Sequence, residues 1–501
     1  MPEYVMTGSE CRQIDQLAVS CLNLSEFQLM QRAADAALDK LVQYWPLVRR
    51  IAVYCGPGNN GGDGYLVAAG AKKLGYGVRL FTLGSPVSDT AQRAQQLAFA
   101  QGLSCESIND NIRNCFDPQA NLIVDALFGH GLERAIGPPL WALFECINAS
   151  SIPVFALDMP SGINSDTAAV MGISIKAAST ICFVAPKIGL LTGNGADFAG
   201  QLYYDALGIP EYVFSQVQAS YEWLEGAFLK HVLPVPRASS HKGDFGHVAI
   251  VGGQPGIPGA VILAALAAAH SGAGRVTVIC SEIHAPFIPL ASPVLMTTTI
   301  DQEAHFSLPE SITALALGPG LGTGVWGRAV YDRALQQAIE LGLPVLLDAD
   351  GLNLLAHQHS RYENWVLSPH PKEAARLLAC SLSEIQSNRP QACLRIAERY
   401  GGVCVLKGQG SLVASASARR GICTLGNWGM ATAGSGDVLS GIIAAMLGQG
   451  LPLFEAASAA VILHAKAGDL AATAMSRRGM ISSDIIECLP EVFQALEMNG
   501  G

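Results

Sequence analysis

The sequence predicts an α/β protein with two domains, each built on a mostly parallel sheet. Three observations carry this prediction. Short apolar runs end in Gly or Pro, Ala/Leu/Gln-rich stretches of helical length separate several of them, and the series begins anew in the second half of the chain. Strands that are apolar throughout are typical of a sheet covered by helices on both faces. At 501 residues the chain also exceeds the length of one ordinary domain.

The apolar runs place the elements in order along the chain. The first series predicts strands at residues 49–56, 77–84, 121–129, 152–160 and 179–186, with helices over 64–74 and 89–101. The second series predicts strands at 246–253, 275–281, 312–320, 343–351 and 402–408. Between them, a stretch with Pro210, Pro234 and Pro236 lacks clear periodicity. We therefore expect domains at 1–215 and 241–501, joined by a linker at 216–240.

Composition excludes several classes of protein. Half of the residues are hydrophobic and 14% are charged, which is too apolar for a disordered chain. The formal net charge of −10 argues against a nucleic-acid partner, and no apolar run reaches the roughly 18 residues of a membrane span. The N-terminal residues do not resemble a signal peptide, and the 13 cysteines include no C-x-x-C pair. We expect a cytoplasmic protein with reduced thiols and no membrane or nucleic-acid partner.

The first candidate site follows the strand at 49–56. The segment GPGNNGGDG, residues 56–64, leads from this strand into a helical pattern. Such a loop can present backbone amides and a helix N-terminus to a pyrophosphate, although a tight turn would need the same glycines. No acidic residue ends a second strand about 20 positions later, which argues against a hydride-transferring dehydrogenase.

Polar side chains follow two further strands of the first series. Asp125, Asp158 and Ser161 lie where ligands gather in open parallel sheets. Amide, carboxylate and hydroxyl oxygens from Asn60, Asp125 and Ser161 suit a hard cation, which would leave Asp158 free to act on a ligand. Each Asp taken alone could instead cap a turn or helix.

Four motifs in this half resemble the NAD(P)H-hydrate epimerase family over nearly all of residues 1–215: NNGGDG, GHGLERAIGPP, DMPSGINSDT and VAPKIGL. The resemblance implies a Rossmann-like three-layer α/β domain that binds hydrated dihydronicotinamide dinucleotide and K⁺. It implies a potassium shell of Asn60, Asp125 and Ser161, with Asp158 as a catalytic substrate contact. The implied substrate-binding residues are Asn59, Asn60, Gly61, Gly62, Asp63, Gly129, His130, Gly131, Leu132, Glu133, Arg134 and Ala135, and His130 stands where many relatives have Thr.

A more specific pattern occupies residues 427–447 of the second half. NWGMATAGSGDVLSGIIAAML runs from a small-residue loop into an apolar helix, with Asp437 in the first turn. Backbone amides at 434–436 and the helix dipole can form an anion hole, beside which Asp437 can accept a hydroxyl proton. The plain alternative is a favourable acidic residue at a helix N-terminus.

Nucleotide must be held without a Walker loop, because the chain contains no Gly-Lys dipeptide. The segment from Lys407 to Ser411 follows a predicted strand and supplies a cation, flexible backbone amides and a hydroxyl. A turn with a surface lysine explains it equally well. His370, in LSPHPKEAARLL, follows another strand, and a lone histidine is usually structural.

Six motifs over residues 241–447 resemble the ADP-dependent NAD(P)H-hydrate dehydratase family, which has a ribokinase-like α/β fold: HKGDFGHVAIVGG, GPGLG, LDADGLNLL, SPHPKEAARLL, LKGQGS and GMATAGSGD. The resemblance implies Asp437 as catalytic base and ADP as phosphoryl donor, and we expect Mg²⁺ in this domain. The implied contacts are Ala260, Gly320, Gly322, His370 and Asp437 for the hydrated dinucleotide, and Lys407, Gly408, Gln409, Gly410, Ser411 and Gly436 for the adenine nucleotide.

Together the two resemblances imply a bifunctional metabolite-repair enzyme. The first domain would interconvert the R and S hydrates of NADH and NADPH. The second would dehydrate the S hydrate with ADP and release AMP and phosphate. We also expect a homo-oligomer. Two alternatives stay open: a ribokinase-like small-molecule kinase whose product keeps its phosphate, and a non-catalytic dinucleotide-binding first domain.

Overall fold

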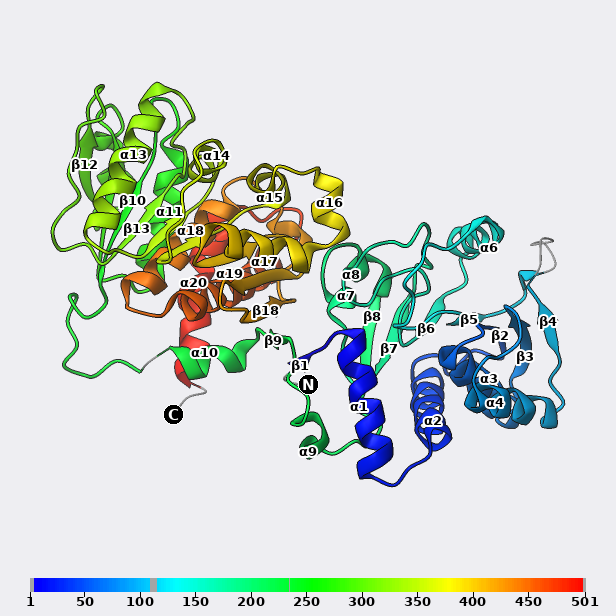
Figure 1. The fold of residues 1–501 in the computed structure, drawn as a ribbon. Coiled ribbons are helices and arrows are strands. Elements are labelled where there is room, and N and C mark those ends of the chain that lie inside the picture. Colours follow the sequence, from blue (N-terminus) through cyan, green and yellow to red (C-terminus); the bar gives the residue numbers. More distant parts are fainter. Residues whose placement is uncertain (1–3, 109–114, 234, 499–501) are drawn as a thin grey trace. The chain divides into compact units, whose positions relative to one another are not determined.

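The computed structural model describes residues 4–108, 115–233 and 235–498, so Pro234, the start of the first predicted domain and the end of the second lie outside the description. The chain forms two compact units (Figure 1). The N-terminal unit is Met1–Glu222 with Gln386–Asn388, and the C-terminal unit is Trp223–Ile385 with Arg389–Gly501. The expected linker at 216–240 contains the strand β9 (Tyr221–Trp223) and the helix α10 (Gly226–Val232), which buries Leu229. Both elements are too short to leave a periodic pattern.

The N-terminal unit contains a seven-stranded parallel sheet in the order β4-β3-β2-β5-β6-β7-β8 (Figure 1). Its strands are β2 (Arg50–Cys55), β3 (Gly77–Thr82), β4 (Cys105–Ser107), β5 (Leu122–Ala126), β6 (Val154–Leu157), β7 (Ser179–Phe183) and β8 (Gln201–Asp205). All five predicted strands lie in this sheet. The unpredicted β4 and β8 are its two edges, where partial exposure removes the continuous apolar pattern. A short β1 (Tyr4–Val5) pairs antiparallel with β9.

Helices cover both faces of this sheet, as its apolar strands predict. Along β2, Ile51 and Val53 belong to the core under α1 to α4, whereas Ala52 and Tyr54 belong to the core under α6. The alternation follows from the two-residue period of a strand and confirms the three-layer fold. The helices are α1 (Gly8–Cys21), α2 (Glu26–Tyr44), α3 (Asn59–Lys73), α4 (Asp89–Ala100), α6 (Pro138–Ala149), α7 (Ile188–Leu191), α8 (Gly193–Ala199) and α9 (Glu211–Phe214).

The predicted ligand loop after β2 is largely helical, which corrects the sequence interpretation. α3 begins at Asn59 rather than near Gly64, so NNGGDG forms its first turns. Glycine is a poor helix former, and its clustering therefore suggested a loop. Packing overrides propensity here: a Cβ on Gly61 would lie 1.9 Å from the carbonyl oxygen of Gly56, and one on Gly62 would lie 2.5 Å from Cε of Met30.

Gly61→Ala is therefore expected to destabilise the N-terminal unit by about 1–3 kcal/mol, because the chain must move to accept the methyl group. Gly77→Ala is a matched control, since its Cβ would meet its nearest atom, the carbonyl oxygen of Arg49, at 3.6 Å. Urea unfolding followed by circular dichroism measures both. Equal midpoints for the two variants would contradict the packing role of Gly61.

The C-terminal unit has the sheet order β18-β17-β16-β15-β14-β13-β10-β11-β12 (Figure 1). Pairing is parallel from β12 to β16 and antiparallel for β17 and β18. The strands are β10 (His247–Val251), β11 (Arg275–Ser281), β12 (Met296–Ile300), β13 (Ala314–Leu317), β14 (Val345–Leu347), β15 (Trp365–Leu367), β16 (Val403–Leu406), β17 (Ser411–Ser415) and β18 (Arg420–Cys423). All five predicted strands are present.

Helices also surround this second sheet. Val248 and Ile250 of β10 share a core with α11, α18, α19 and α20, while α13 and α17 pack on β13 and β16. The helices are α11 (Gly259–His270), α12 (Ile288–Ala291), α13 (Val325–Glu340), α14 (Asp350–His357), α15 (Pro371–Leu378), α16 (Leu382–Ser387), α17 (Arg389–Tyr400), α18 (Ser435–Gly448), α19 (Leu453–Met475) and α20 (Ser482–Met498), with 3₁₀ turns at Ala285–Phe287 and Trp428–Met430. Among the described residues, no helix is both long and apolar enough to cross a membrane.

The strand order of the C-terminal unit changes direction beside β10. From β10 the chain continues to β11 on one side, and it later returns to β13 on the other side. Such a switch point in an open parallel sheet opens a crevice at the carboxyl ends of the strands. The segments that follow β13, β14, β15 and β16 all begin at this edge.

Candidate functional site

A cavity of about 1070 Å³ lies at the carboxyl edge of the N-terminal sheet. Its walls come from α1, α2, the start of α3 and the segments after β5, β6 and β7. The predicted residues that line it are Asn59, Asn60, Asp63, Gly129, His130, Gly131, Leu132, Glu133, Arg134 and Asp158. Gly61, Gly62 and Ala135 are not among its lining residues. The sequence therefore located the cavity, although two of its glycines serve packing.

Asp158 lies inside a buried charge network. It follows β6 directly, at a backbone φ of +63° that non-glycine residues rarely adopt. Its Oδ1 accepts a hydrogen bond from Nζ of Lys187. Its Oδ2 accepts from the backbone N–H of His130 at 3.0 Å and from the ring Nδ1 of His130 at 2.7 Å. Asp158 is therefore not free, contrary to the sequence interpretation.

The charge states of this network follow from its contacts. Burial alone would raise the pKa of Asp158, but Lys187 and His130 outweigh burial and hold that pKa far below its usual range. Burial likewise opposes the charge on Lys187, while Asp158 raises the Lys187 pKa above its ordinary value. Lys187 also donates to the carbonyl oxygen of Phe183 at 2.7 Å. The pair is thus a fixed carboxylate and a fixed ammonium at the base of the cavity.

Two other carboxyl groups face the same cavity with raised pKa values. Burial raises the pKa of Asp63 well above its usual value, and the nearby Asp158 and Asp15 add to this effect. Burial raises the pKa of Asp15, on α1, to about 6. Neither Asp15 nor Lys187 was identified from sequence. Lys187 left one signal, because it is a charged residue four positions after a buried strand in VAPKIGL.

The three predicted cation ligands lie at this same edge of the sheet. Asp125 accepts from Oγ of Ser161 at 2.6 Å, from its backbone N–H at 2.8 Å and from the backbone N–H of Leu127 at 3.2 Å. Burial raises the pKa of Asp125 to about 6 against these hydrogen bonds. Oδ1 and Nδ2 of Asn60 are buried without a hydrogen-bond partner in the described part of the chain. A buried carboxylate and an orphaned amide oxygen fit a hard monovalent cation.

The C-terminal unit gathers a second set of charges around the start of α18. Gly434 begins this helix at a φ of +85°, and Asp437 lies in its first turn. Lys407 Nζ is 2.7 Å from Oδ1 of Asp348, whose Oδ2 accepts from Oγ of Ser440 at 2.6 Å. A Cβ on Gly436 would lie 3.5 Å from Lys407 Nζ. The helix N-terminus, a cation and Asp437 therefore share one site.

Asp437 has the electrostatics of a weakened acid. Burial raises its pKa to about 6, with Asp348 and Asp350 adding to the rise and Lys407 opposing it. The predicted role of Asp437 as a base is compatible with this value, because the group is mainly ionised at neutral pH. Asp348 was missed from sequence. In the motif LDADG, Asp348 stands at the end of an apolar strand, and this is the same signal that identified Asp125 and Asp158.

The predicted dinucleotide contacts lie at the start of α11 and in the segments that follow β13 and β15. A Cβ on Gly320 would lie 3.3 Å from Cβ of Ala260, and one on Gly322 would lie 2.0 Å from Oε1 of Gln254. Gly322 donates its backbone N–H to Asp350 Oδ2 at 2.8 Å. Gly320 and Gly322 have φ values of +60° and +75°, so both require glycine for conformation as well as space.

His370 has a clear local role in addition to any ligand contact. Its Nδ1 accepts from the backbone N–H of Lys372 at 3.0 Å and of Glu373 at 3.3 Å, so it caps α15. Burial and the charge of Lys407 lower its pKa. Burial raises the pKa of Glu373 to about 7. His370 is therefore a neutral ring whose position is fixed by the helix start.

The predicted nucleotide segment, residues 407–411, leads from β16 into β17. Lys407 donates its backbone N–H to the carbonyl oxygen of Pro369 at 3.0 Å, which joins this segment to the one carrying His370. The buried Arg389 donates to the carbonyl oxygen of Lys407 at 3.2 Å. Ser411 donates its hydroxyl to the carbonyl oxygen of Gly408 at 3.0 Å. These three contacts hold the backbone of the segment in place.

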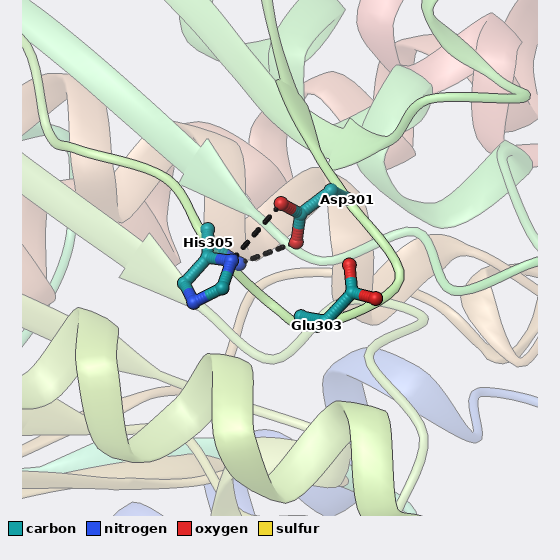
Figure 2. A group of neighbouring side chains, drawn as sticks. All are labelled: Asp301, Glu303 and His305. Atoms are coloured by element: carbon teal, nitrogen blue, oxygen red, sulfur yellow. Dashed lines mark hydrogen bonds and ion pairs between the residues drawn. The ribbon is translucent and has the colours of Figure 1, made fainter.

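One further group of side chains lies outside both sites. Figure 2 shows Asp301, Glu303 and His305 close together on the segment after β12. His305 donates its backbone N–H to Asp301 Oδ1 at 2.7 Å, and its Nδ1 contacts Asp301 Oδ2 at 3.1 Å. These contacts are those of a capped turn with exposed side chains.

Known proteins are similar to this chain over nearly its whole length. A family model described as YjeF-related protein N-terminus matches residues 26–189, and one described as NAD(P)H-hydrate dehydratase matches residues 248–491. The chain is 41% identical to a bifunctional NAD(P)H-hydrate repair enzyme of Coxiella burnetii, over 95% of this chain and 96% of that one. It is 39% identical to the corresponding Escherichia coli protein, over 98% of this chain and 94% of that one.

Solved structures add a likeness to the C-terminal unit. The crystal structure of an ADP/ATP-dependent NAD(P)H-hydrate dehydratase from Bacillus subtilis, co-crystallised with ATP and Mg²⁺, has 28% sequence identity and a TM-score of 0.50. The match covers 55% of this chain and 98% of that one. A ribokinase-like superfamily protein from Enterococcus faecalis has 26% identity and a TM-score of 0.50, over 55% of this chain and 96% of that one.

Proposed function

Because the chain belongs to the family of bifunctional NAD(P)H-hydrate repair enzymes, we propose that each of its two sites catalyses one step of that repair. The N-terminal cavity epimerises the hydrates of NADH and NADPH. The site around Asp437 dehydrates the S hydrate with ADP and releases AMP and phosphate. The observation that carries the second assignment is the position of Asp437 beside Lys407 and the N-terminus of α18.

At the second site we assign Asp437 to proton transfer, and the amides at 434–436 and Lys407 to charge stabilisation. Asp437 accepts the proton of the substrate hydroxyl as that oxygen attacks the β-phosphate of ADP. The amides at 434–436 and Lys407 balance the charge of the transferring group. Phosphate then leaves from the ring carbon and takes up a proton from the neighbouring carbon, which restores the double bond. Phosphate is a far better leaving group than hydroxide, so a kinase-like site suits a dehydration.

At this site, separate groups of residues bind the dinucleotide and the adenine nucleotide. We assign the dinucleotide to Ala260, Gly320, Gly322 and His370, and the adenine nucleotide to residues 407–411 and Gly436. The carboxylates near Asp437 are compatible with Mg²⁺, which in proteins is typically held by one or two carboxylates and by substrate phosphates.

At the sheet edge that carries the N-terminal cavity we assign K⁺ to Asn60, Asp125 and Ser161. We assign the substrate to the residues that line the cavity, with Asp158 in contact with it. Support comes from the orphaned amide of Asn60 and from the raised pKa of Asp125. Bound potassium would supply the positive charge that offsets the buried carboxylate and fixes the segment after β5.

The assignment of K⁺ predicts that Asn60→Ala removes the potassium response of epimerisation while leaving the fold intact. The side chain of Asn60 forms no hydrogen bond with the described residues, so it is a cleaner probe than Asp125, whose carboxylate accepts three. Epimer exchange is measured across a potassium series with sodium keeping the ionic strength constant. An unchanged potassium curve for folded Asn60→Ala would refute the site, and Asp125→Ala should lose the response as well as stability.

The whole proposal is tested by incubating the chain with mixed epimers of NADPH hydrate, with and without ADP. We expect recovery of dihydronicotinamide absorbance from both epimers, with one phosphate released for each product, only when ADP is present. A stable phosphorylated product would favour the small-molecule kinase. Recovery of the S epimer alone would favour a non-catalytic first domain.

Two expectations concern the setting of the enzyme. We assign it to the cytoplasm, supported by its thirteen cysteines, none of which forms a disulfide in the described part of the chain. We also retain the homo-oligomer, which sedimentation equilibrium of the full chain tests.

A further inference from the structure

We propose that His130 is the proton-transfer residue of the epimerase site, and that Asp158 and Lys187 hold its ring in the working orientation. The inference rests on the epimerase function assigned above and goes beyond it by naming the group that handles the proton. It also changes the role of Asp158 from a reacting group to a positioning one.

The hydrogen bonds of His130 fix its tautomer. Asp158 is an acceptor, so the ring Nδ1 must carry the proton that it donates at 2.7 Å. The backbone N–H of the same residue donates to the same oxygen at 3.0 Å, which restrains both ends of the residue. Nε2 is therefore the ring nitrogen that can take up or release a proton. The His130 side chain lines the cavity and is 22% exposed, so Nε2 can be reached by a bound ligand or water.

The other groups of the network are poorly suited to exchange a proton. Asp158 uses one oxygen for Lys187 and the other for His130, and both contacts favour its ionised form. Lys187 is buried and donates to Asp158 and to the Phe183 carbonyl oxygen. Lys187 is therefore an anchor that keeps Asp158 charged, and Asp158 accepts the hydrogen bond that orients the His130 ring.

Two of the other carboxyl groups that line the cavity have raised pKa values and are rival proton donors. Asp63 lies on α3 and Asp15 lies on α1, and the charged side chains of Arg12, Glu26, Glu133 and Arg134 also line the cavity. Burial raises the pKa of Asp63 well above its usual value, which disfavours the ionised form that a base needs. Asp15, with a pKa raised to about 6 by burial, is the stronger rival, and the experiment must separate it from His130.

The substrate chemistry requires one proton carrier of this kind. Water adds to the enamine double bond of the reduced nicotinamide at the carbon next to the ring nitrogen, so the hydrate is a carbinolamine. The imidazolium of His130 protonates its hydroxyl, the carbon–oxygen bond breaks, and water leaves as the nitrogen lone pair forms an iminium ion. A water molecule then adds to the other face and returns a proton to His130. The number of protons and of water molecules is unchanged over the cycle.

The same network explains why this site would epimerise and not dehydrate. Dehydration requires a base that removes a proton from the carbon beside the iminium. Asp158 is held too tightly by Lys187 and His130 to act as that base. Its charge instead stabilises the iminium ion electrostatically. The carbon–hydrogen bond survives, and the double bond is not restored.

The test compares His130→Gln and His130→Ala in the full chain. His305→Gln is the matched control, because His305 also contacts an Asp through Nδ1 but is exposed and lies in the other unit (Figure 2). Epimer exchange of NADPH hydrate is followed by chromatography in water enriched in oxygen-18, after subtraction of the spontaneous rate. Wild type should incorporate one solvent oxygen per inversion and, in deuterium oxide, no deuterium at the neighbouring carbon.

We expect both His130 variants to lose about 10²- to 10⁴-fold in epimerisation, the range for removal of a general acid–base group. Added imidazole should restore His130→Ala in part, which a purely structural role would not allow. ADP-dependent dehydration of the S hydrate should be unchanged in all variants.

Three results would overturn the inference while leaving the epimerase function standing: full activity of His130→Gln, loss of activity only in Asp15→Asn, or inversion without uptake of solvent oxygen. Absence of epimerisation in wild type would instead overturn the proposed function.

Discussion

Asp437→Asn is expected to lower ADP-dependent dehydration by about 10²- to 10⁴-fold and to leave epimerisation unchanged. The amide keeps the shape of the side chain in the first turn of α18 but cannot take the hydroxyl proton. Separated sites generally behave additively, so the N-terminal cavity should not respond. The two rates are measured on the same preparation, as phosphate release from the S hydrate and as exchange between the epimers.

The pH dependence provides an independent check on Asp437. A base acts in its ionised form, and burial together with Asp348 raises the Asp437 pKa to about 6. The dehydration rate should therefore fall as the pH drops through about 6 and reach its plateau about one pH unit above that value. Asp332→Asn, at an exposed position on α13, is the control and should keep the wild-type rate and profile. A dehydration rate retained in Asp437→Asn would rule out the assignment.

Much of the fold could be predicted because buried parallel strands leave continuous apolar runs. The run at 275–281 coincides with β11, and each of the other nine runs encloses one strand. Edge strands escaped notice, since β4 and β8 are partly exposed and β17 and β18 pair antiparallel at the end of the second sheet. The first turns of α3 were missed for another reason, because tertiary packing selects glycines that helix propensity disfavours.

In the candidate sites, the sequence identified residues by their place in a strand or helix but not residues whose role depends on a distant partner. Asp125, Asp158 and Asp437 were identified because a polar residue at a strand end or helix start is a local signal. Lys187 and Asp348 were missed because their importance lies in the partner they contact. No spacing rule connects Lys187 to Asp158, which lies 29 positions earlier. Only the three-dimensional contact shows that Asp158 is held by two partners.

Asp158→Asn is expected to abolish measurable epimerisation and to destabilise the N-terminal unit by about 3–5 kcal/mol. The large cost arises because Lys187 would remain as a buried ammonium without its carboxylate. His130 also loses the carboxylate that restrains its ring. Urea unfolding of the full chain, with hydrogen exchange of β6 and β7 to localise the change, measures the stability. The ADP-dependent step on pure S hydrate should persist wherever the C-terminal unit remains folded.

Asp158→Asn combined with Lys187→Met separates charge burial from catalysis. Removing both charges eliminates the unpaired ammonium, so the double variant should recover much of the lost stability while staying inactive as an epimerase. The wild-type pair should also show a characteristic acid response. The folded pKa of Asp158 lies below its unfolded value of about 3.9, so its stabilisation is present above that pH and declines as the pH falls below it. The double variant should lack this decline. Equal stability of the two variants, or epimerase activity in the double variant, would show that the buried pair does not hold the site as we infer.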